Sequence, residues 1–259
     1  RRARLGHGTT GAAPATPGAA LVACGGGVGG TTERPRDRAT LLAFIAGDPA
    51  LAALRDEAAA RDAATPDAAH DLEHSLRVAL WTLRCGPELP ERLAVATALL
   101  HDAVRVPKHH PERPRAGERS AEHARERLRA LGFAPEEAGA AAAAIRDHGF
   151  SRLVEPADPL GRALQDADRL DALGAVGLAR LFATGAAMGA AFFDPDDPWA
   201  RRRAPDDRAH SVDHFFTKLL RLPGSMRTEA GRREAAARAR LLRDYLAALG
   251  RELEEPPPE

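Results

Sequence analysis

The sequence contains little cysteine and little lysine. Its two cysteines, Cys24 and Cys85, are too few for a disulfide framework and lack the spacing of a cysteine metal site. So few cysteines are typical of proteins in a reducing compartment, and we predict a cytoplasmic location. Lys108 and Lys218 are the only lysines among 37 basic residues. The compact charge of a lysine ammonium at either position is therefore a candidate substrate contact.

Two further absences narrow the classes of function. The 37 basic and 37 acidic residues give a formal net charge of zero, so no overall field attracts nucleic acid or an anionic membrane. No apolar run approaches the roughly 18 residues of a membrane-spanning helix. We therefore expect no nucleic-acid partner and no membrane partner, and a small anionic substrate would need a local positive site.

Composition changes along the chain predict one domain between two tails. Residues 1–37 are rich in Gly, Ala, Pro and Thr without sustained periodicity, which indicates a disordered segment. Residues 38–253 carry apolar side chains at helical spacing, interrupted by Gly and Pro turns. Residues 254–259 are a proline-rich tail, also predicted to be disordered. The central pattern predicts an all-α domain that is long enough to bury a substantial core.

An apolar helical run ends on two adjacent side chains that bind metal ions. In the segment Ala94–Asp102, His101 and Asp102 directly follow a pair of leucines. A run this apolar belongs in a core, whereas imidazole and carboxylate groups are ligands for divalent ions. We interpret this helix end as one side of a metal site.

Two other segments supply side chains of the same kind. Upstream, the run Glu73–Val78 presents His74, and downstream a buried-looking helix carries Asp166, Asp168 and Asp171. On a helix Asp168 and Asp171 share a face, while Asp166 points away.

The order His, His-Asp, Asp, with each member on its own helix, resembles the HD-domain metal-dependent phosphohydrolase superfamily. The run Asp-Ala-Asp-Arg-Leu-Asp-Ala-Leu-Gly-Ala from residue 166 is the most specific piece. It is similar to a compact bacterial single-domain branch, near the nucleotide pyrophosphohydrolases of this superfamily. The resemblance implies a helical bundle that holds a divalent ion, Mn²⁺ first, with Mg²⁺, Co²⁺, Zn²⁺ or Fe²⁺ as alternatives. The implied ligands are His74, His101, Asp102 and Asp168.

Positive side chains near these ligands are candidates for binding phosphate. Arg105 stands where some small HD nucleotidases carry a glutamate that orients water, so the chain departs from that version of the mechanism and favours an anionic substrate. We assign catalytic roles to Asp102, Arg105 and Lys108. The predicted substrate contacts are Arg77, Lys108, His148 and Lys218. A solvated loop around Lys108 and a core role for Lys218 stay open as alternatives.

Other arrangements of the histidines fit less well. His70 and His74 have the spacing of a zinc protease helix, but Asp71 stands where that motif needs its glutamate. His148 and His123 resemble the extra histidines that hold a second metal in some HD phosphodiesterases. The mononuclear set is complete without them.

The leading prediction is a phosphohydrolase of enzyme class 3.1 or 3.6 that cleaves a phosphoester or phosphoanhydride bond of a small nucleotide-like substrate. A nucleoside triphosphate pyrophosphohydrolase is one form of it. The alternative is a non-catalytic domain that binds metal and nucleotide as a sensor. A cyclic-dinucleotide phosphodiesterase lacks support, because the only tyrosine, Tyr245, is not in a Gly-Tyr-Pro signature. A homodimer is an open alternative to a monomer.

Overall fold

The structure is a computed structural model, and its description covers most of the unit Glu33–Glu259. The described residues are 33–64, 71–106, 111–112, 115–152 and 154–258. Within them the regular elements are helices, apart from one isolated bridge between Ala191 and His210. The predicted all-α class is confirmed. Of the segment predicted to be disordered, residues 1–32 lie outside the described residues.

The described helices follow one another along the chain, with a long connection, residues 188–212, between α8 and α9. They are α1 (Arg38–Ala46), α2 (Pro49–Ala64), α3 (Leu72–Cys85), α4 (Glu91–Leu100), α5 (Ala116–Ala130), α6 (Pro135–Asp147), the 3₁₀ turn η2 (Phe150–Arg152), α7 (Pro159–Asp171), α8 (Gly174–Ala187), α9 (Asp213–Thr217), the 3₁₀ segment η3 (Leu219–Ser225) and α10 (Glu229–Glu252).

Side-chain caps and small residues set the helix ends that matter for the site. Asp71 accepts a hydrogen bond from the backbone N–H of His74 at 2.7 Å, so α3 begins at Leu72, two residues before that histidine. Gly86 ends α3. Gly174 has φ +73°, a conformation that favours glycine, and it is the first residue of α8. These ends place His74 in the first turn of α3.

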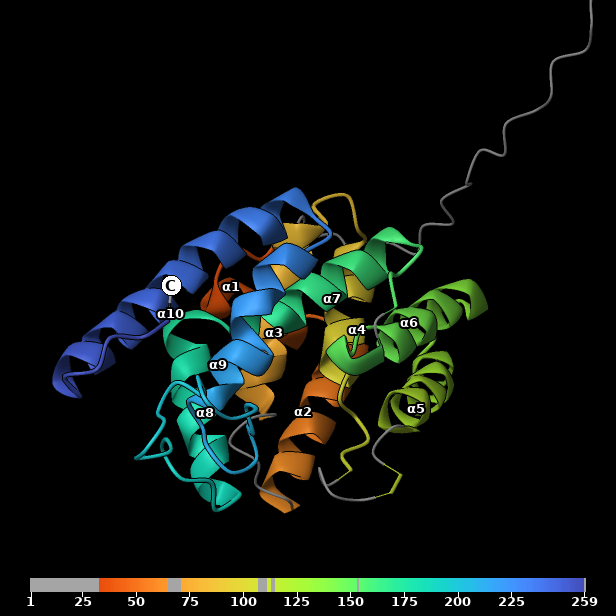
Figure 1. The fold of residues 1–259 in the computed structure, drawn as a ribbon. Coiled ribbons are helices and arrows are strands. Elements are labelled where there is room, and N and C mark those ends of the chain that lie inside the picture. The colour runs from red at the N-terminus through yellow and green to blue at the C-terminus, as the bar shows by residue number, and fades with distance from the viewer. Residues whose placement is uncertain (1–32, 65–70, 107–110, 113–114, 153, 259) are drawn as a thin grey trace, which may run out of the picture. The chain divides into compact units, whose positions relative to one another are not determined.

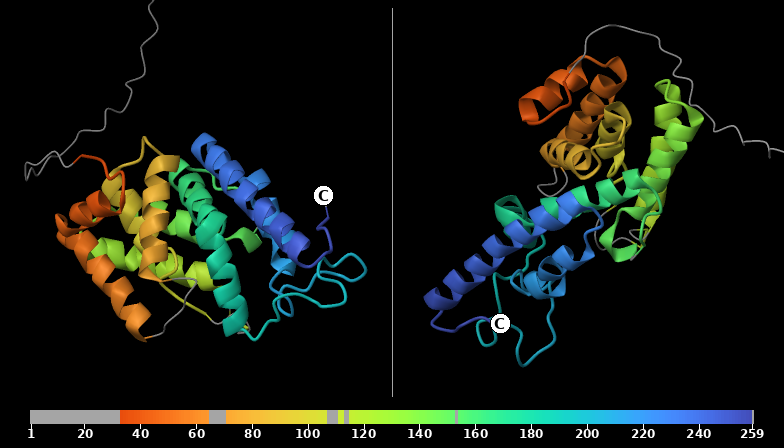
Figure 2. Two further views of the ribbon diagram at one scale, coloured as in Figure 1. Left: turned by 90° about the vertical axis from the view of Figure 1, so that its left-hand side faces the viewer. Right: turned by 90° about the horizontal axis from the view of Figure 1, so that it is seen from above.

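Helix α7 lies between two hydrophobic cores. Its residues Leu160, Leu164 and Ala167 join the core built with α1–α6. Ala163 and Leu170, from another side of the same helix, join the core built with α9, η3 and α10. In Figures 1 and 2, α3 and α7 run through the middle of the unit, the α5–α6 pair lies at one side, and α10 lies at the other. Both faces of α7 are therefore anchored, which fixes the side chains between them.

Parts of both predicted tails make specific contacts. Arg34 donates hydrogen bonds to the carbonyls of Leu83 and Gly86 at 3.0 and 2.9 Å. At the other end, Trp199 Nε1 donates to the carbonyl of Glu255 at 3.1 Å. Disorder was expected for residues 254–259, but residues 254–258 turn back toward α10, where a side chain at Gly250 would collide with Pro257. Prolines that pack against a helix end are ordered by that contact.

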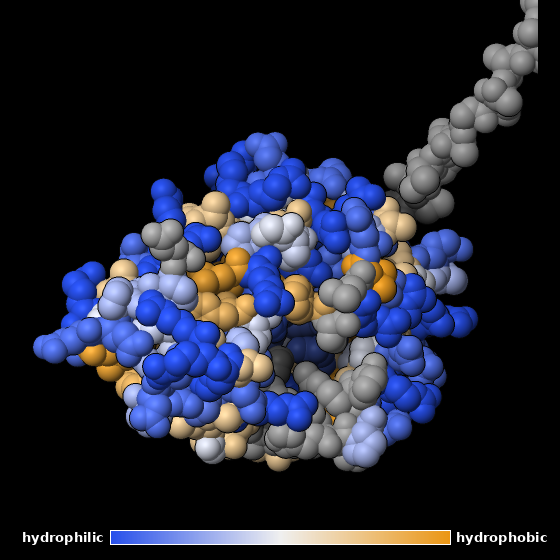
Figure 3. Space-filling model, viewed as in Figure 1, coloured by the Kyte–Doolittle hydropathy of each residue, from blue (hydrophilic) through white to orange (hydrophobic). Residues whose placement is uncertain are grey.

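The surface is mostly hydrophilic. Figure 3 shows one face on which hydrophobic areas lie near the middle and at the left edge, with a hollow beside those in the middle. The large apolar side chains exposed among the described residues are Val176, Phe192 and Leu241. In the part of the chain that the structure describes, no single helix is long and apolar enough to cross a membrane, and α7 with α8 passes such a test only as a pair bent by 68°.

Candidate metal centre

His74 is held in one orientation and one tautomer. Its ring is fully buried, and Nδ1 lies 2.7 Å from Oδ2 of Asp171, at the C-terminal end of α7. An ionised carboxylate accepts hydrogen bonds only, so Nδ1 carries the proton and donates it. The lone pair of Nε2 therefore points away from Asp171, toward α4.

His101 is fixed in the same way at the end of α4. Its Nδ1 lies 2.7 Å from the carbonyl oxygen of Ala98, which can only accept, so Nε2 again carries the lone pair. Burial lowers the pKa of His101 to about 4. The imidazole is therefore neutral near pH 7, which is the form that binds metal ions.

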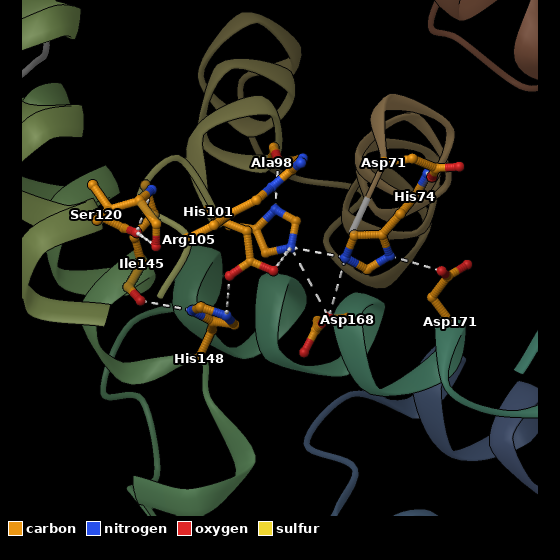
Figure 4. A network of polar contacts seen from close by, with 12 residues as sticks. Asp71, His74, Ala98, His101, Arg105, Ser120, Ile145, His148, Asp168 and Asp171 are labelled. Atoms are coloured by element: carbon orange, nitrogen blue, oxygen red, sulfur yellow. Dashed lines mark hydrogen bonds and ion pairs between the residues drawn. The ribbon is translucent and has the colours of Figure 1, made fainter. Parts of the chain in front are cut away.

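The two ring nitrogens face each other. Figure 4 shows the rings of His74 and His101 side by side, with Asp168 below them. The two Nε2 atoms lie 3.1 Å apart. Oδ1 of Asp168 lies 3.6 Å from Nε2 of His74 and 4.0 Å from Nε2 of His101. Three electron-pair donors from α3, α4 and α7 thus converge on one point.

The spacing of these atoms fits a shared ion. Ligands bound at about 2.0–2.2 Å stand roughly 3.0–4.3 Å apart, depending on the angle at the metal. The distances of 3.1, 3.6 and 4.0 Å fall in this range. A cation between the two lone pairs would also remove their mutual repulsion. The group of His74, His101 and Asp168, with both imidazoles buried and the carboxylate partly exposed, can therefore hold a divalent ion.

A second group shares His101 with the first. It consists of His101, Asp102 and His148, whose ligand atoms lie within 4.8 Å of one another. Oδ2 of Asp102 is 3.6 Å from Nε2 of His101, and its Oδ1 is 3.9 Å from Nε2 of His148. His148 donates from Nδ1 to the carbonyl of Ile145 at 2.6 Å, so its Nε2 also presents a lone pair. Asp102 thus lies between the imidazoles of His101 and His148. Its carboxylate is partly exposed, so the centre is open on this side.

Asp171 supports the centre from behind. Besides His74, it accepts hydrogen bonds from Arg77 at 2.6 and 3.0 Å, and Arg180 of α8 forms an ion pair with it. Burial alone would raise the pKa of Asp171, but the hydrogen bonds from His74 and Arg77 hold it well below its usual value. Asp171 therefore stays ionised and keeps His74 in its metal-binding tautomer. Sequence reasoning missed Arg180, because nothing in its local pattern links α8 to Asp171 of α7.

Asp166 has a separate task. Its carboxylate accepts from the backbone N–H groups of Arg227 and Thr228 at 2.8 and 2.7 Å. A side chain at Gly231 would collide with this carboxylate, so a small residue is needed there. Asp166 thus joins α7 to the start of α10, on a face of the helix away from Asp168.

The structure places the remaining candidate residues around or outside this centre. Arg105 pairs with Asp62 of α2, with NH2 2.6 Å from Oδ1. Lys218 Nζ lies 5.9 Å from the centre of the Phe150 ring. His123 is exposed on α5. The candidates Lys108 and His70 lie outside the described residues.

Comparison with known proteins agrees with this geometry. The HD domain family model matches residues 71–173. The chain is 31% identical over 191 residues to the uncharacterised protein YpgQ of Bacillus subtilis, covering 71% of this chain and 84% of YpgQ. This chain belongs to the HD-domain superfamily. The matched residues include every candidate ligand and Asp171.

Solved structures of HD proteins have the same fold. The crystal structure of Bacillus subtilis YpgQ in complex with ADP matches with a TM-score of 0.58 and 25% identity, over 78% of this chain and 96% of that one. An HD-superfamily hydrolase from Bacillus thuringiensis matches with a TM-score of 0.53 and 29% identity, over 71% and 87% of the two chains. The chain therefore has the fold of HD-superfamily hydrolases, with a His/Asp cluster able to hold a metal ion.

Proposed function

We propose that this HD protein is a metal-dependent phosphohydrolase that acts on a phosphoester or phosphoanhydride of a small, nucleotide-like substrate. The observation that carries the proposal is the pair of Nε2 lone pairs, 3.1 Å apart, with Asp168 beside them. Only a cation or a proton relieves that arrangement, and the pKa of about 4 at His101 disfavours the proton. The ADP bound to YpgQ supports a nucleotide-like substrate.

The chain's own residues suit hydrolysis of a phosphate. A bound divalent ion would lower the pKa of a coordinated water and polarise the phosphoryl oxygen. His74, His101, Asp102 and Asp168 would hold the ion, and Mn²⁺ is our first choice. Asp102 is partly exposed, so it is placed to orient the attacking water, and His148 Nε2 lies 3.9 Å from its Oδ1, where it is placed to accept a proton.

The test is turnover by metal-stripped protein that is reconstituted with Mn²⁺, Mg²⁺, Co²⁺, Zn²⁺ or Fe²⁺. A panel of nucleoside mono-, di- and triphosphates is incubated with each form, and phosphate and pyrophosphate are measured separately. We expect metal-dependent release from at least one nucleotide and loss of that activity in Asp102→Ala. Tight nucleotide binding without product under every metal would instead favour the sensor function.

A further inference from the structure

A pocket lies behind the candidate metal centre, and Asp171 forms part of its wall. Its volume is about 370 Å³, and residues of α3, α8, α10 and the α7–α8 turn line it. The volume falls within the roughly 300–1,000 Å³ of sites that bind small molecules. The lining is mostly apolar and also carries two arginines; its larger members are Arg77, Trp81, Leu173, Val176, Arg238 and Leu241.

The apolar wall of the pocket is more exposed than other apolar surface of this protein. The large apolar side chains exposed among the described residues are Val176, Phe192 and Leu241. Val176 and Leu241, 40% and 39% exposed, line the pocket. Phe192 packs against Phe182, with ring centres 4.7 Å apart, and is not part of the lining. Covering apolar surface is favourable, so the pocket favours a ligand with an apolar body.

Two guanidiniums give the pocket a positive wall. Arg77, predicted from sequence to contact the substrate, lines this pocket and donates to Asp171 from Nε and Nη2. Arg238 donates from Nη1 to the carbonyl of Leu170 at 2.7 Å. It donates from Nε to Glu234, also at 2.7 Å.

Each of these guanidiniums keeps one nitrogen for a ligand. Within the residues that the structure describes, Nη1 of Arg77 and Nη2 of Arg238 make no hydrogen bond, and neither atom is shut off from solvent. The two side chains hold neighbouring residues at the end of α7, Asp171 and Leu170, so they lie on the same side of the pocket. Carboxylate, sulfonate and phosphate oxygens match such N–H groups.

We propose that this pocket is a second binding site, for a small organic anion that carries an apolar body. The body covers Trp81, Val176 and Leu241, and the anionic group accepts hydrogen bonds from Arg77 and Arg238. The guanidinium carbon of Arg238 lies 4.9 Å from the centre of the Trp81 ring, so charge and apolar surface are adjacent. This inference goes beyond the proposed function, because no step of the hydrolysis uses this pocket.

The pocket is connected to the metal centre through Asp171. This carboxylate lines the pocket, binds Arg77 and accepts from Nδ1 of His74 at 2.7 Å. An anion on Arg77 offsets part of the positive charge that draws on Asp171, so Asp171 polarises His74 more strongly. The anion's own charge also favours a nearby cation. Both effects raise metal affinity, and the coupling between two binding sites is reciprocal.

The first experiment titrates metal-free full-length protein with 8-anilinonaphthalene-1-sulfonate, an aromatic anion that fluoresces in apolar surroundings. We expect one site per chain. Displacement by 2-naphthoate should need about 10-fold less compound than displacement by neutral 2-naphthamide, the effect of losing one charged hydrogen bond. Absence of binding, or equal displacement by the two compounds, would overturn the inference.

A pocket-filling variant locates the site. Ala237 is an exposed residue of α10 in the lining, so Ala237→Trp should abolish binding of the fluorescent anion without disturbing the core. The matched control is Ala236→Trp, at the adjacent exposed position outside the lining, which should bind as wild type. Unchanged binding by Ala237→Trp would overturn the site. A wild-type dimer that this variant converts to a monomer in analytical ultracentrifugation would assign the pocket to a second copy instead.

Mn²⁺ titrations test the coupling to the metal centre. Saturating 2-naphthoate should raise the Mn²⁺ affinity of wild type about fivefold, at the lower end of couplings between sites, and should leave that of Ala237→Trp unchanged. Equal Mn²⁺ affinity of wild type with and without 2-naphthoate would overturn the coupling. A protein that binds the fluorescent anion but hydrolyses no nucleotide would count against the proposed function and leave the second site standing.

Discussion

Two buried polar clusters in this protein differ in how donors and acceptors are matched. At Asp213, at the start of α9, the fully buried carboxylate accepts from Arg203 NH2 at 2.9 Å and from the backbone N–H of Asp206 at 2.7 Å. Arg203 also pairs with Asp194. Every strong acceptor named there has a donor, so the cluster holds its loop together by itself.

The centre between α3, α4 and α7 has the opposite arrangement. Each imidazole donates its one N–H to a partner on the side away from the centre. His74 donates to Asp171, and His101 donates to the Ala98 carbonyl. What faces inward is a set of electron pairs. Burial of polar groups therefore does not by itself mark a functional site, whereas converging acceptors do. Substitutions in the Asp213 cluster should therefore lower stability, whereas substitutions in the centre should lower metal affinity.

The largest effect on stability is expected from Asp213→Ala. The change leaves Arg203 without its buried carboxylate, and breaking a buried pair in this way costs about 3–5 kcal/mol. Chemical denaturation of metal-free protein measures the loss. Mn²⁺ content per folded molecule should equal that of wild type, and a variant that loses metal while keeping its stability would contradict the division between the two clusters.

The next largest effect is expected from His101→Ala. Removing a ligand that belongs to both candidate groups should lower Mn²⁺ affinity by at least about 100-fold, or about 2.7 kcal/mol. Elemental analysis after gel filtration and the thermal shift produced by Mn²⁺ both report it. The exposed His123→Ala is the matched control and should behave as wild type. Normal metal binding by His101→Ala would show that the centre is wrongly assigned.

A smaller effect is expected from Asp171→Asn, since the residue acts through His74. Loss of such a supporting carboxylate typically lowers metal affinity about 10- to 100-fold. Asp166→Asn, on the same helix, should instead lower the unfolding temperature and leave metal affinity unchanged, because Asp166 secures the start of α10. Titration of Mn²⁺ into both proteins makes the comparison, and equal affinities would refute the role of Asp171.

The last effect is a pH dependence in metal-free protein. Burial depresses the pKa of His101 from 6.5 to about 4 in the folded state, so between these values the unfolded chain binds a proton that the folded chain does not. The contribution of His101 to folding stability is fully present above pH 6.5 and decreases as the pH falls toward 4. Denaturant titrations from pH 7 to 4.5 should show a shallower decline for His101→Ala than for wild type. Parallel curves would speak against the buried neutral imidazole.

The sequence predicted the parts of this account that depend on local pattern. The apolar run that ends at His101 and the acidic run on α7 were sufficient to predict helices, and the resemblance to the HD-domain superfamily supplied the set of four candidate ligands. It also predicted that Asp166 would point away from Asp168, because helical geometry fixes that angle. The all-α class follows from the same periodicity, and the family match confirms the superfamily.

What the sequence left out depends on contacts between distant segments. The ion pair of Arg180 with Asp171 joins α8 to α7, and the ion pair of Arg105 with Asp62 joins the loop after α4 to α2. Arginine is abundant along the chain, so composition does not reveal that these two ion pairs form. The order in residues 254–258 arises from Trp199, 56 residues from the carbonyl it binds. Tertiary packing decides each of these cases.

The most direct test of the central claim is an anomalous-diffraction map of crystals grown with Mn²⁺. The account predicts an ion peak about 2.0–2.2 Å from Nε2 of both His74 and His101, with Asp168 on the same ion. A map with no peak between these two imidazoles, from protein that is otherwise folded as described, would contradict it.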